Sequence, residues 1–213
     1  SSKRLINRIW YNGEKNMEKY ELVTDIKKVE RLIFEINTIH KKYSEEYFES
    51  GKIAKVNLKH TFAKVPVDEI LKYRLNLHES INDYLMVADV SDISYFYRVK
   101  TSESILDKIE RFTKRPEGYP VNSVLNDIFG ARVILPTSVI TEVMNRLDDW
   151  KEEYGLKNWY LKDTEDYTGI HLYFKNKSQF YYPWELQIWD KNDISRNIES
   201  HKRYYARKLD NNN

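Results

Sequence analysis

The first half of the chain carries apolar residues at intervals of three and four, the spacing that forms one face of a helix. Over residues 20–50 this pattern predicts a long helix, which Gly51 ends or bends. A second helix is expected over residues 67–85, entered through Pro66. We therefore expect a helical N-terminal part over residues 1–90.

The second half alternates between runs rich in β-branched and aromatic residues and stretches with helical spacing. Strands are predicted at residues 93–99, 128–135, 159–161, 169–174 and 184–189. Helices are predicted at residues 101–111, 138–154 and 193–208, with Ser102 as the N-cap of the first and Gly155 closing the second. This order predicts an α+β fold, in which a mixed sheet of five strands is flanked by helices over residues 91–213, within one compact domain overall.

The composition is that of a globular protein. Of the 213 residues, 41% are apolar and 32% are charged, so the chain can form a hydrophobic core. No stretch approaches the roughly 20 apolar residues of a membrane span, and residues 1–5 lack the apolar centre of a secretory signal. Because the chain has no cysteine, disulfides and thiolate zinc sites are excluded. We expect a cytoplasmic protein that contacts no membrane.

The junction between a predicted strand and a predicted helix carries a set of phosphate-binding side chains. Arg98 and Lys100 end the strand, and Ser104 and Lys108 follow Lys100 at helical spacing of four. These groups, together with the free N–H groups of the helix N-terminus, can surround a polyphosphate. The plainer interpretation of this segment alone is a solvated helix face.

Two further strands carry carboxylates beside other polar groups. Asp127 opens one strand, where it can hold magnesium on triphosphate oxygens, and Arg132 on that strand can lie flat against a purine. On a later strand Glu185 and Gln187 point to the same face, which suits a metal ligand or base and an orienting amide. The alternatives are a turn Asp with an exposed Arg, and a half-buried strand with a polar outer face.

The segment between these strands contains Tyr167 in a short polar loop and His171 in the strand that follows. A tyrosine in a loop can stack on a nucleobase. A lone histidine in a strand is most often a core residue, so His171 remains open between a core, a ligand and a phosphate-contacting role.

In their order and spacing these segments resemble the synthetase domain of the RelA/SpoT family. The pattern is Arg-x-Lys with Ser four and Lys eight residues after that Lys, then Asp-Ile-x-Gly-x-Arg, Tyr-x-x-x-His and Glu-x-Gln-Ile, and a histidine, His201, in a basic closing helix. The resemblance covers residues 94–208 and implies a nucleotidyltransferase-like synthetase fold over residues 91–213.

The resemblance also implies roles for the site residues in a pyrophosphate transfer from ATP that depends on Mg²⁺. Arg98 and Arg132 would enclose the adenine, and Lys100, Ser104 and Lys108 would contact the triphosphate. Asp127 and Glu185 would bind Mg²⁺, with Glu185 also a candidate base, and Tyr167 would stack on the acceptor base. Gln187, His171 and His201 match motif positions without a firm role. AMP is the expected leaving product.

The departures from the family pattern lie on the acceptor side. Many members have a serine where Gly169 follows Thr168, and they continue with Arg-Thr where this chain has Trp189 and Asp190. We expect a toxic small alarmone synthetase that modifies the 3′ CCA end of tRNA and so inhibits translation, with an antitoxin protein as a possible partner. The alternatives are an alarmone synthetase that uses GDP or GTP as acceptor and a non-catalytic nucleotide-binding domain.

The charge pattern favours tRNA over a guanine nucleotide. Near Tyr167 three carboxylates, those of Asp163, Glu165 and Asp166, are offset in the sequence only by Lys162, which disfavours a second polyphosphate. Basic residues that can follow an acceptor stem lie elsewhere, on one face of residues 52–64 if that segment is helical and on the closing helix: Lys52, Lys55, Lys59, Lys202 and Arg203. Ordinary solvated lysines are the alternative.

Overall fold

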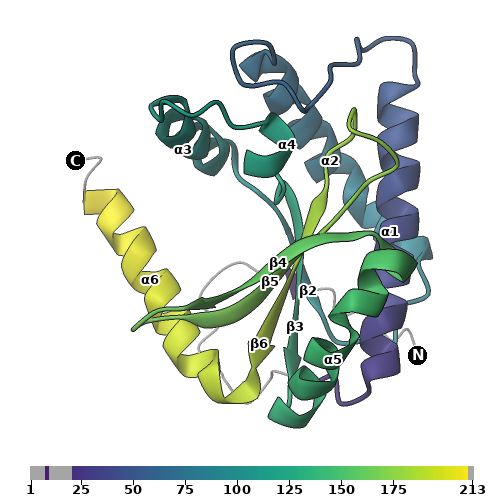
Figure 1. Cartoon of the computed structure of the whole chain (residues 1–213), viewed down its shortest axis with the longest axis vertical. Coiled ribbons are helices and arrows are strands. Elements are labelled where there is room, and N and C mark those ends of the chain that lie inside the picture. The colour runs from purple at the N-terminus through teal and green to yellow at the C-terminus, as the bar shows by residue number, and fades with distance from the viewer. Residues whose placement is uncertain (1–7, 10–20, 211–213) are drawn as a thin grey trace.

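A computed structural model describes residues 8–9 and 21–210 of the chain, and Figure 1 shows the arrangement of its elements. The strands form one mixed sheet in the order β1-β2-β3-β6-β5-β4. Their bounds are β1 (Arg8–Ile9), β2 (Phe96–Val99), β3 (Phe129–Leu135), β4 (Leu156–Asp163), β5 (Thr168–Phe174) and β6 (Trp184–Asp190). The predicted α+β fold and the five predicted strands are confirmed, and the two-residue β1 is an addition at the sheet edge.

The predicted helices are also present, with small shifts at their ends. They are α1 (Ile26–Phe48), α2 (Val67–Val87), α3 (Ser102–Thr113), α5 (Thr137–Tyr154) and α6 (Ile194–Asp210), joined by the short α4 (Val121–Val124) and the 3₁₀ turn η2 (Lys191–Asp193). The remainder of the predicted N-terminal part, residues 1–7 and 10–20, lies outside the described residues, as do residues 211–213. Residues 1–5, on which the expectation of no secretory signal rests, are therefore outside the described residues.

The N-cap of α3 differs from the prediction. Thr101, not Ser102, has the extended backbone of a cap, and its hydroxyl accepts a hydrogen bond from the N–H of Ser104 at 3.2 Å. Ser102 is already the first helical residue, so its own hydroxyl cannot reach the N–H groups that a cap satisfies. The predicted closure of α5 is confirmed, because Gly155 adopts the left-handed φ of 69°.

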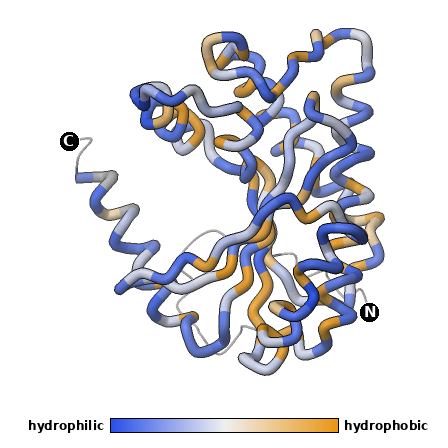
Figure 2. Tube along the Cα trace, viewed as in Figure 1, coloured by the Kyte–Doolittle hydropathy of each residue, from blue (hydrophilic) through white to orange (hydrophobic). Residues whose placement is uncertain are grey.

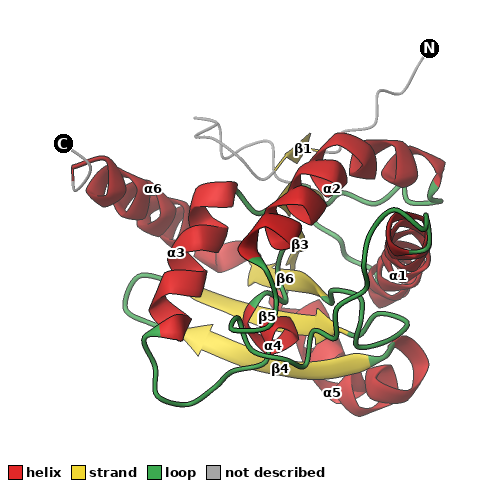
Figure 3. Cartoon of the chain, turned by 90° about the horizontal axis from the view of Figure 1, so that it is seen from above, coloured by secondary structure: helices red, strands yellow, loops and turns green. Residues whose placement is uncertain are grey.

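One face of the sheet is apolar and forms the main core. Figures 1 and 3 show α1 and α5 on this side, and Figure 2 shows the hydrophobic centre of the sheet strands. Strand alternation places residues such as Ala131, Leu186 and Leu172 in one row across this face, and all three are completely buried. Residues of α1 and α2 belong to the same buried cluster as these strand residues.

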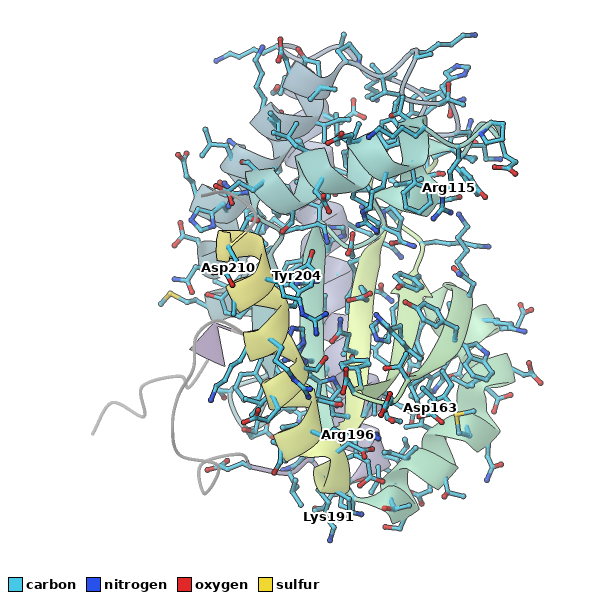
Figure 4. All side chains as sticks on the ribbon, turned by 90° about the vertical axis from the view of Figure 1, so that its left-hand side faces the viewer. Arg115, Asp163, Lys191, Arg196, Tyr204 and Asp210 are labelled. Carbon is cyan, nitrogen blue, oxygen red and sulfur yellow. The ribbon has the colours of Figure 1, made fainter. Side chains whose placement is uncertain are left out.

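The opposite face is polar and is flanked by α3 and α6, which both lie on the left of Figure 1. A second, smaller apolar cluster fixes the start of α6 on this face, where Ile194 packs with Ile134, Tyr167 and Trp189. Figure 4 looks onto this side, with α6 in front of the strands and α3 crossing above them. The polar face is therefore framed by two helices and carries the candidate site.

The segment between α1 and α2 contradicts one sequence prediction. It consists of turns and irregular backbone, so Lys52, Lys55 and Lys59 do not share a helix face. Besides local turns, its backbone bonds to other parts of the chain, as the N–H of Leu58 donates to the carbonyl of Gln179 at 3.0 Å. Lys55 forms an ion pair with Glu49, and Gly51 between them adopts a left-handed φ of 75°.

None of the helices in the described part of the chain has both the length and the apolar character needed to span a membrane.

Candidate active site

Two rows of side chains cross the polar face of the sheet. Strand register aligns the first row in the order Arg98, Gly130, Glu185, Tyr173 and Asn158. It aligns the second in the order Phe96, Arg132, Gln187, His171 and Tyr160. The predicted pairing of Glu185 with Gln187 on one face is confirmed by this register. Glycine at position 130 adds no side chain between Arg98 and Glu185.

Asp127 lies at the entrance of β3, where three cations surround it. The ammonium nitrogen of Lys100 is 3.0 Å from Oδ2, that of Lys108 is 3.2 Å from Oδ1, and a guanidinium nitrogen of Arg98 is 3.9 Å from Oδ2. The corner between β2 and α3 is fixed by Arg74, whose Nε donates to the carbonyl of Lys100 at 2.9 Å. The sequence prediction that Lys100 and Lys108 approach one point agrees with this geometry.

The charges around Asp127 keep it ionised although it is buried. Burial alone raises the pKa of its carboxyl, but the positive charges of Lys108, Lys100 and Arg98 outweigh it, and the pKa lies well below its usual value. Burial lowers the pKa of Lys100, and the charge of Asp127 opposes that decrease. The cluster is a compact set of buried charges that holds a surplus of positive charge.

Ser104 does not join this cluster. Its hydroxyl is 3.0 Å from the hydroxyl of Thr101, the capping residue, and it lies partly exposed on α3. A serine in the first turn of a helix is drawn to the cap, because the hydroxyl and N–H groups there are its nearest partners. It remains near the N-terminus of α3, where a phosphate would also meet free N–H groups.

Glu185 is held by three neighbouring side chains. The hydroxyl of Tyr173 donates to Oε2 at 2.8 Å, His171 Nδ1 is 3.2 Å from the same oxygen, and the amide of Gln187 donates to Oε1 at 2.8 Å. Burial alone raises the pKa of Glu185, but the hydrogen bond and charge of His171 outweigh it, so the net pKa is below the usual value. The carboxylate is therefore ionised and fixed in orientation.

A chain of hydrogen bonds continues from Glu185 away from β3. His171 connects Glu185 to Tyr167, because its Nε2 atom is 3.0 Å from the hydroxyl of Tyr167. The indole N–H of Trp189 donates to the same hydroxyl at 3.0 Å. The ring of Tyr160 stacks on the ring of His171, with centres 4.9 Å apart. His171 is thus not a core residue without a polar role, because both of its ring nitrogens contact groups of the site.

Tyr167, which the sequence predicts just ahead of a strand and which the resemblance would place against the acceptor base, is buried in this structure. Only 8% of Tyr167 is exposed, its ring packs in the small apolar cluster below α6, and burial raises its pKa to about 12. The residue lies immediately before β5 and not at the tip of the loop, and its hydroxyl has partners inside the site that hold it inward. In this structure its ring offers no open face to a base.

His201 lies on α6 above the same cluster. Its ring stacks with that of Trp189, with centres 6.1 Å apart, and meets Tyr167 edge-on at 6.1 Å. Burial and the charges of Arg132 and Arg98 lower its pKa to about 3, so it is neutral at physiological pH. The closing helix therefore reaches the site through an uncharged histidine.

The acidic loop beside Tyr167 is more nearly neutral than the sequence indicates. A guanidinium nitrogen of Arg203 on α6 is 3.3 Å from Asp166, and the hydroxyl of Thr168 donates to Asp163 at 2.9 Å. Lys162 is therefore not the only cation near these carboxylates. The sequence argument missed Arg203 because it lies 37 residues from Asp166 in the chain.

Two carboxylates with only oxygen donors suit magnesium in their chemistry. Mg²⁺ is usually bound by one or two carboxylates and completed by substrate phosphates and water. Asp127 and Glu185 are both ionised and buried, and the negative charge of Asp127 acts on the pKa of Glu185. Among the described residues there is no group of three or more histidines, cysteines or carboxylates that could hold a metal alone. The donor set therefore fits a metal that arrives with a nucleotide.

Sequence reasoning missed three residues that shape the site. Tyr173 could have been found from strand alternation, since it follows His171 by two positions. The roles of Tyr160 and Trp189 depend on contacts across strands, which the sequence pattern does not show.

Lys202 and Arg203 are exposed on α6, but Arg203 is paired with Asp166 and does not form a separate basic surface.

Comparisons with known proteins found similarity only among solved structures. No family model matches the chain, and no curated protein matches it significantly. The chain is similar to the small alarmone synthetase 2 of Bacillus subtilis, at 23% identity over 68% of this chain and 81% of that chain, with a TM-score of 0.37. It is also similar to the small alarmone synthetase 1 of the same organism, at 17% identity over 66% of this chain and 79% of that chain, with a TM-score of 0.38. The structure of small alarmone synthetase 1 bound to AMPCPP is similar at 22% identity over 66% of this chain and 76% of that chain, with a TM-score of 0.34.

Proposed function

We propose that this chain transfers the β,γ-pyrophosphate of ATP to the 3′-hydroxyl of an acceptor nucleotide. The observation that carries the proposal is the approach of Lys100 and Lys108 to Asp127, next to the row that holds Glu185. A site of this kind has cations for a polyphosphate, carboxylates for a metal and an oriented base within one face of the sheet.

The ATP side of the site uses the cations that now contact Asp127. Lys100 and Lys108 exchange their contacts with Asp127 for contacts with triphosphate oxygens, while Ser104 and the N-terminus of α3 lie beside them. Arg98 and Arg132 lie on the same sheet face, where guanidinium groups can stack on the adenine. Asp127 and Glu185 would hold magnesium, which would neutralise charge on the phosphate oxygens.

Glu185 is the group best placed to take the proton of the attacking hydroxyl. In the transfer the 3′-oxygen forms a bond to the β-phosphorus, the bond from that phosphorus to the oxygen of the α-phosphate breaks, and AMP leaves. The proton passes to Glu185, whose orientation is fixed by Tyr173, His171 and Gln187. General base catalysis of this kind contributes typically 10²–10⁴-fold in rate.

For the acceptor we propose the 3′-terminal nucleotide of tRNA. The support is basic surface beyond the paired charges: Lys202 and Arg207 are exposed on α6, and Lys59, Lys157 and Lys175 lie at the opposite end of the polar face. A pyrophosphate on the terminal nucleotide blocks the hydroxyl that receives the amino acid, so such an enzyme stops translation. An activity of this kind in a cell calls for a neutralising partner, which we propose to be an antitoxin protein.

A guanine nucleotide is the second candidate acceptor, and one observation favours it. The contact of Arg203 with Asp166 places a cation in the loop that the sequence presents as acidic. Repulsion of a second polyphosphate is therefore weaker than the sequence indicates.

A competition experiment tests the reaction and the acceptor together. The protein is incubated with magnesium and ATP labelled on its terminal phosphate, with tRNA and GDP at equal access and moderate salt, and AMP is measured in parallel. We expect AMP release and label in tRNA. Predominant label in GDP selects the second candidate, and the absence of AMP release with every acceptor indicates a domain that only binds nucleotides.

A further inference from the structure

A polar pocket lies beside the candidate site, on the side away from Tyr167. It has a volume of about 90 Å³, large enough for several water molecules or one phosphate group. We call it the amide pocket, and the residues that line it are Asn122, Ser123, Asn126, Lys157, Asn158, Tyr173 and Pro183. None of these described lining residues is a carboxylate.

The amide groups of this pocket have no protein partners. Within the described part of the chain, the side chains of Asn122, Asn126 and Asn158 make no hydrogen bond to another residue. Asn122 is only 9% exposed as a residue, but its amide atoms are not among the fully buried, unpaired atoms of the described side chains, so they remain open to the pocket. The pocket is therefore built from polar groups whose hydrogen bonds are left for a ligand or for water.

The pocket is positively charged at its rim. Lys157 lines it, and burial together with the charges of Lys175 and Lys59 lowers the pKa of Lys157. Lys59 is held near the pocket because the carbonyls on either side of it, those of Leu58 and His60, accept hydrogen bonds from the start of α4. Amide N–H donors beside three lysines suit an anion, and phosphate is the anion that substrates of this site carry.

The pocket also touches the neighbours of both candidate catalytic carboxylates. Asn126 directly precedes Asp127, and Tyr173 donates its hydroxyl hydrogen to Glu185 at 2.8 Å. Asn158 extends the sheet row that contains Glu185 and Tyr173. A ligand in the pocket is therefore separated from Glu185, the base that we assign to the acceptor hydroxyl, by the side chain of Tyr173.

We propose that the amide pocket binds the 5′-phosphate of the acceptor nucleotide. This inference rests on the proposed function, because it takes Glu185 as the group that meets the 3′-hydroxyl. One ribose carries both the 3′-hydroxyl and the 5′-phosphate, so an acceptor with its hydroxyl at Glu185 brings its phosphate close to Tyr173. That phosphate is either part of the di- or triphosphate of a guanine nucleotide or the diester that joins the last two nucleotides of tRNA.

Binding of matched probes tests the proposal without catalysis. With the ATP site filled by a non-hydrolysable ATP analogue and magnesium, dissociation constants are measured for GDP against guanosine and for cytidylyl-adenosine against adenosine. We expect the phosphate-bearing probe of one pair to bind about tenfold or more tightly than its nucleoside. The pair that shows this preference identifies the source of the phosphate.

Substitutions locate the preference in the pocket. Lys157→Glu and Asn158→Leu should reduce it to less than about threefold, while Lys42→Glu, the same charge change on an exposed lysine of α1, should preserve it. Asn158 is exposed, so its variant tests the pocket even if Lys157→Glu fails to fold. The proposal is overturned if the wild-type protein shows no preference in either pair, or if both variants keep it.

The proposed function is tested separately by label transfer from ATP. If the wild-type protein prefers the phosphate-bearing probe but transfers no label, the phosphate-binding role of the pocket stands and the proposed reaction is wrong. If label is transferred and the KM for the acceptor is unchanged in both pocket variants, the proposed reaction stands and the role of the pocket is wrong.

Discussion

The guanidinium carbon of Arg132 lies 3.6 Å from the centre of the indole ring of Trp189. The same arginine donates two hydrogen bonds to Oε1 of Gln187, at 3.0 and 3.3 Å. Trp189 stands where the resembled family continues with an arginine, so in this chain an aromatic ring covers one side of Arg132. In the proposed ATP site this leaves only the opposite side of Arg132 for an adenine, so Trp189 would support that site through Arg132.

Replacement of Trp189 should therefore affect both stability and ATP binding. We expect Trp189→Ala to lower the free energy of unfolding by about 3–5 kcal/mol, because it removes a fully buried ring. Trp189→Phe keeps a ring against Arg132 and should cost less, although it loses the N–H donor to Tyr167. Urea unfolding and binding of a non-hydrolysable ATP analogue measure the two effects. Full analogue affinity in a folded Trp189→Ala protein would show that the contact with Arg132 is unrelated to ATP.

The two carboxylates should be needed for transfer and not for folding. Glu185→Gln keeps a side chain of the same shape, and we expect about a 10²–10⁴-fold loss of turnover with a native circular dichroism spectrum. Asp127→Asn should abolish transfer and lower stability modestly, because Arg98, Lys100 and Lys108 then repel one another. AMP release at saturating magnesium is the measurement. Near-normal turnover in either variant would remove that residue from the site.

The two tyrosine hydroxyls of the site should behave differently. Tyr173→Phe removes a hydrogen bond to Glu185 and should lower turnover with unchanged binding of an ATP analogue. Tyr167→Phe leaves the indole N–H of Trp189 without its partner and should also lower the free energy of unfolding by about 1–3 kcal/mol. Urea unfolding separates the variants. Equal stability losses would show that the hydroxyl of Tyr173 is structurally as important as that of Tyr167.

Much of the fold follows from local sequence patterns. Apolar spacing found α1, α2 and α5 because each presents a single face to the core, and strand alternation put Glu185 and Gln187 on one face. The segment after α1 was harder to predict, because its lysines at positions 52, 55 and 59 fit a helical spacing by chance. The backbone of this segment bonds in part to distant partners, as Leu58 does to Gln179, and local spacing does not reveal such contacts.

The site was predictable in its residues more than in its contacts. Helical spacing predicted that Lys100 and Lys108 face one point, but not that Asp127 lies between them. Burial of Tyr167 was not predictable, since it depends on the hydroxyl partners that β5 and β6 supply and on the packing of α6. The pairing of Arg203 with Asp166 depends on the same helix.

Stability should fall in mild acid because of a buried histidine. Burial lowers the pKa of His40 to about 3, and its Nε2 atom finds no hydrogen-bond partner among the described residues. The unfolded chain, with a histidine pKa near 6.5, binds the proton more readily, so this stability is present above about pH 6.5 and is lost as the pH falls toward 3. Between pH 6.5 and pH 5 we expect a loss of about 2 kcal/mol in the free energy of unfolding.

Substitution of His40 identifies the source of this dependence. His40→Met should flatten the decrease measured by urea unfolding at each pH, with a residual slope from His201, whose pKa is also lowered to about 3. Replacement of the exposed His78 by Gln is the control. A slope that is unchanged in His40→Met would assign the acid sensitivity to other groups.

Two buried asparagines should respond in opposite directions to the same substitution. The amide of Asn37 is paired at both ends, donating to the carbonyl of Tyr154 at 2.9 Å and accepting from the indole of Trp184 at 2.9 Å. Asn37→Leu leaves both partners buried and unpaired, so we expect the free energy of unfolding to fall by about 2–4 kcal/mol.

The side chain of Asn122 is nearly as buried but has no such partners, so Asn122→Leu should raise the free energy of unfolding by about 1 kcal/mol. The same Asn122→Leu variant should raise the KM for the acceptor, because the amide is retained for a ligand and not for folding. Urea unfolding and acceptor kinetics on both variants give the comparison. Destabilisation of Asn122→Leu together with unchanged acceptor kinetics would show that Asn122 serves the fold alone.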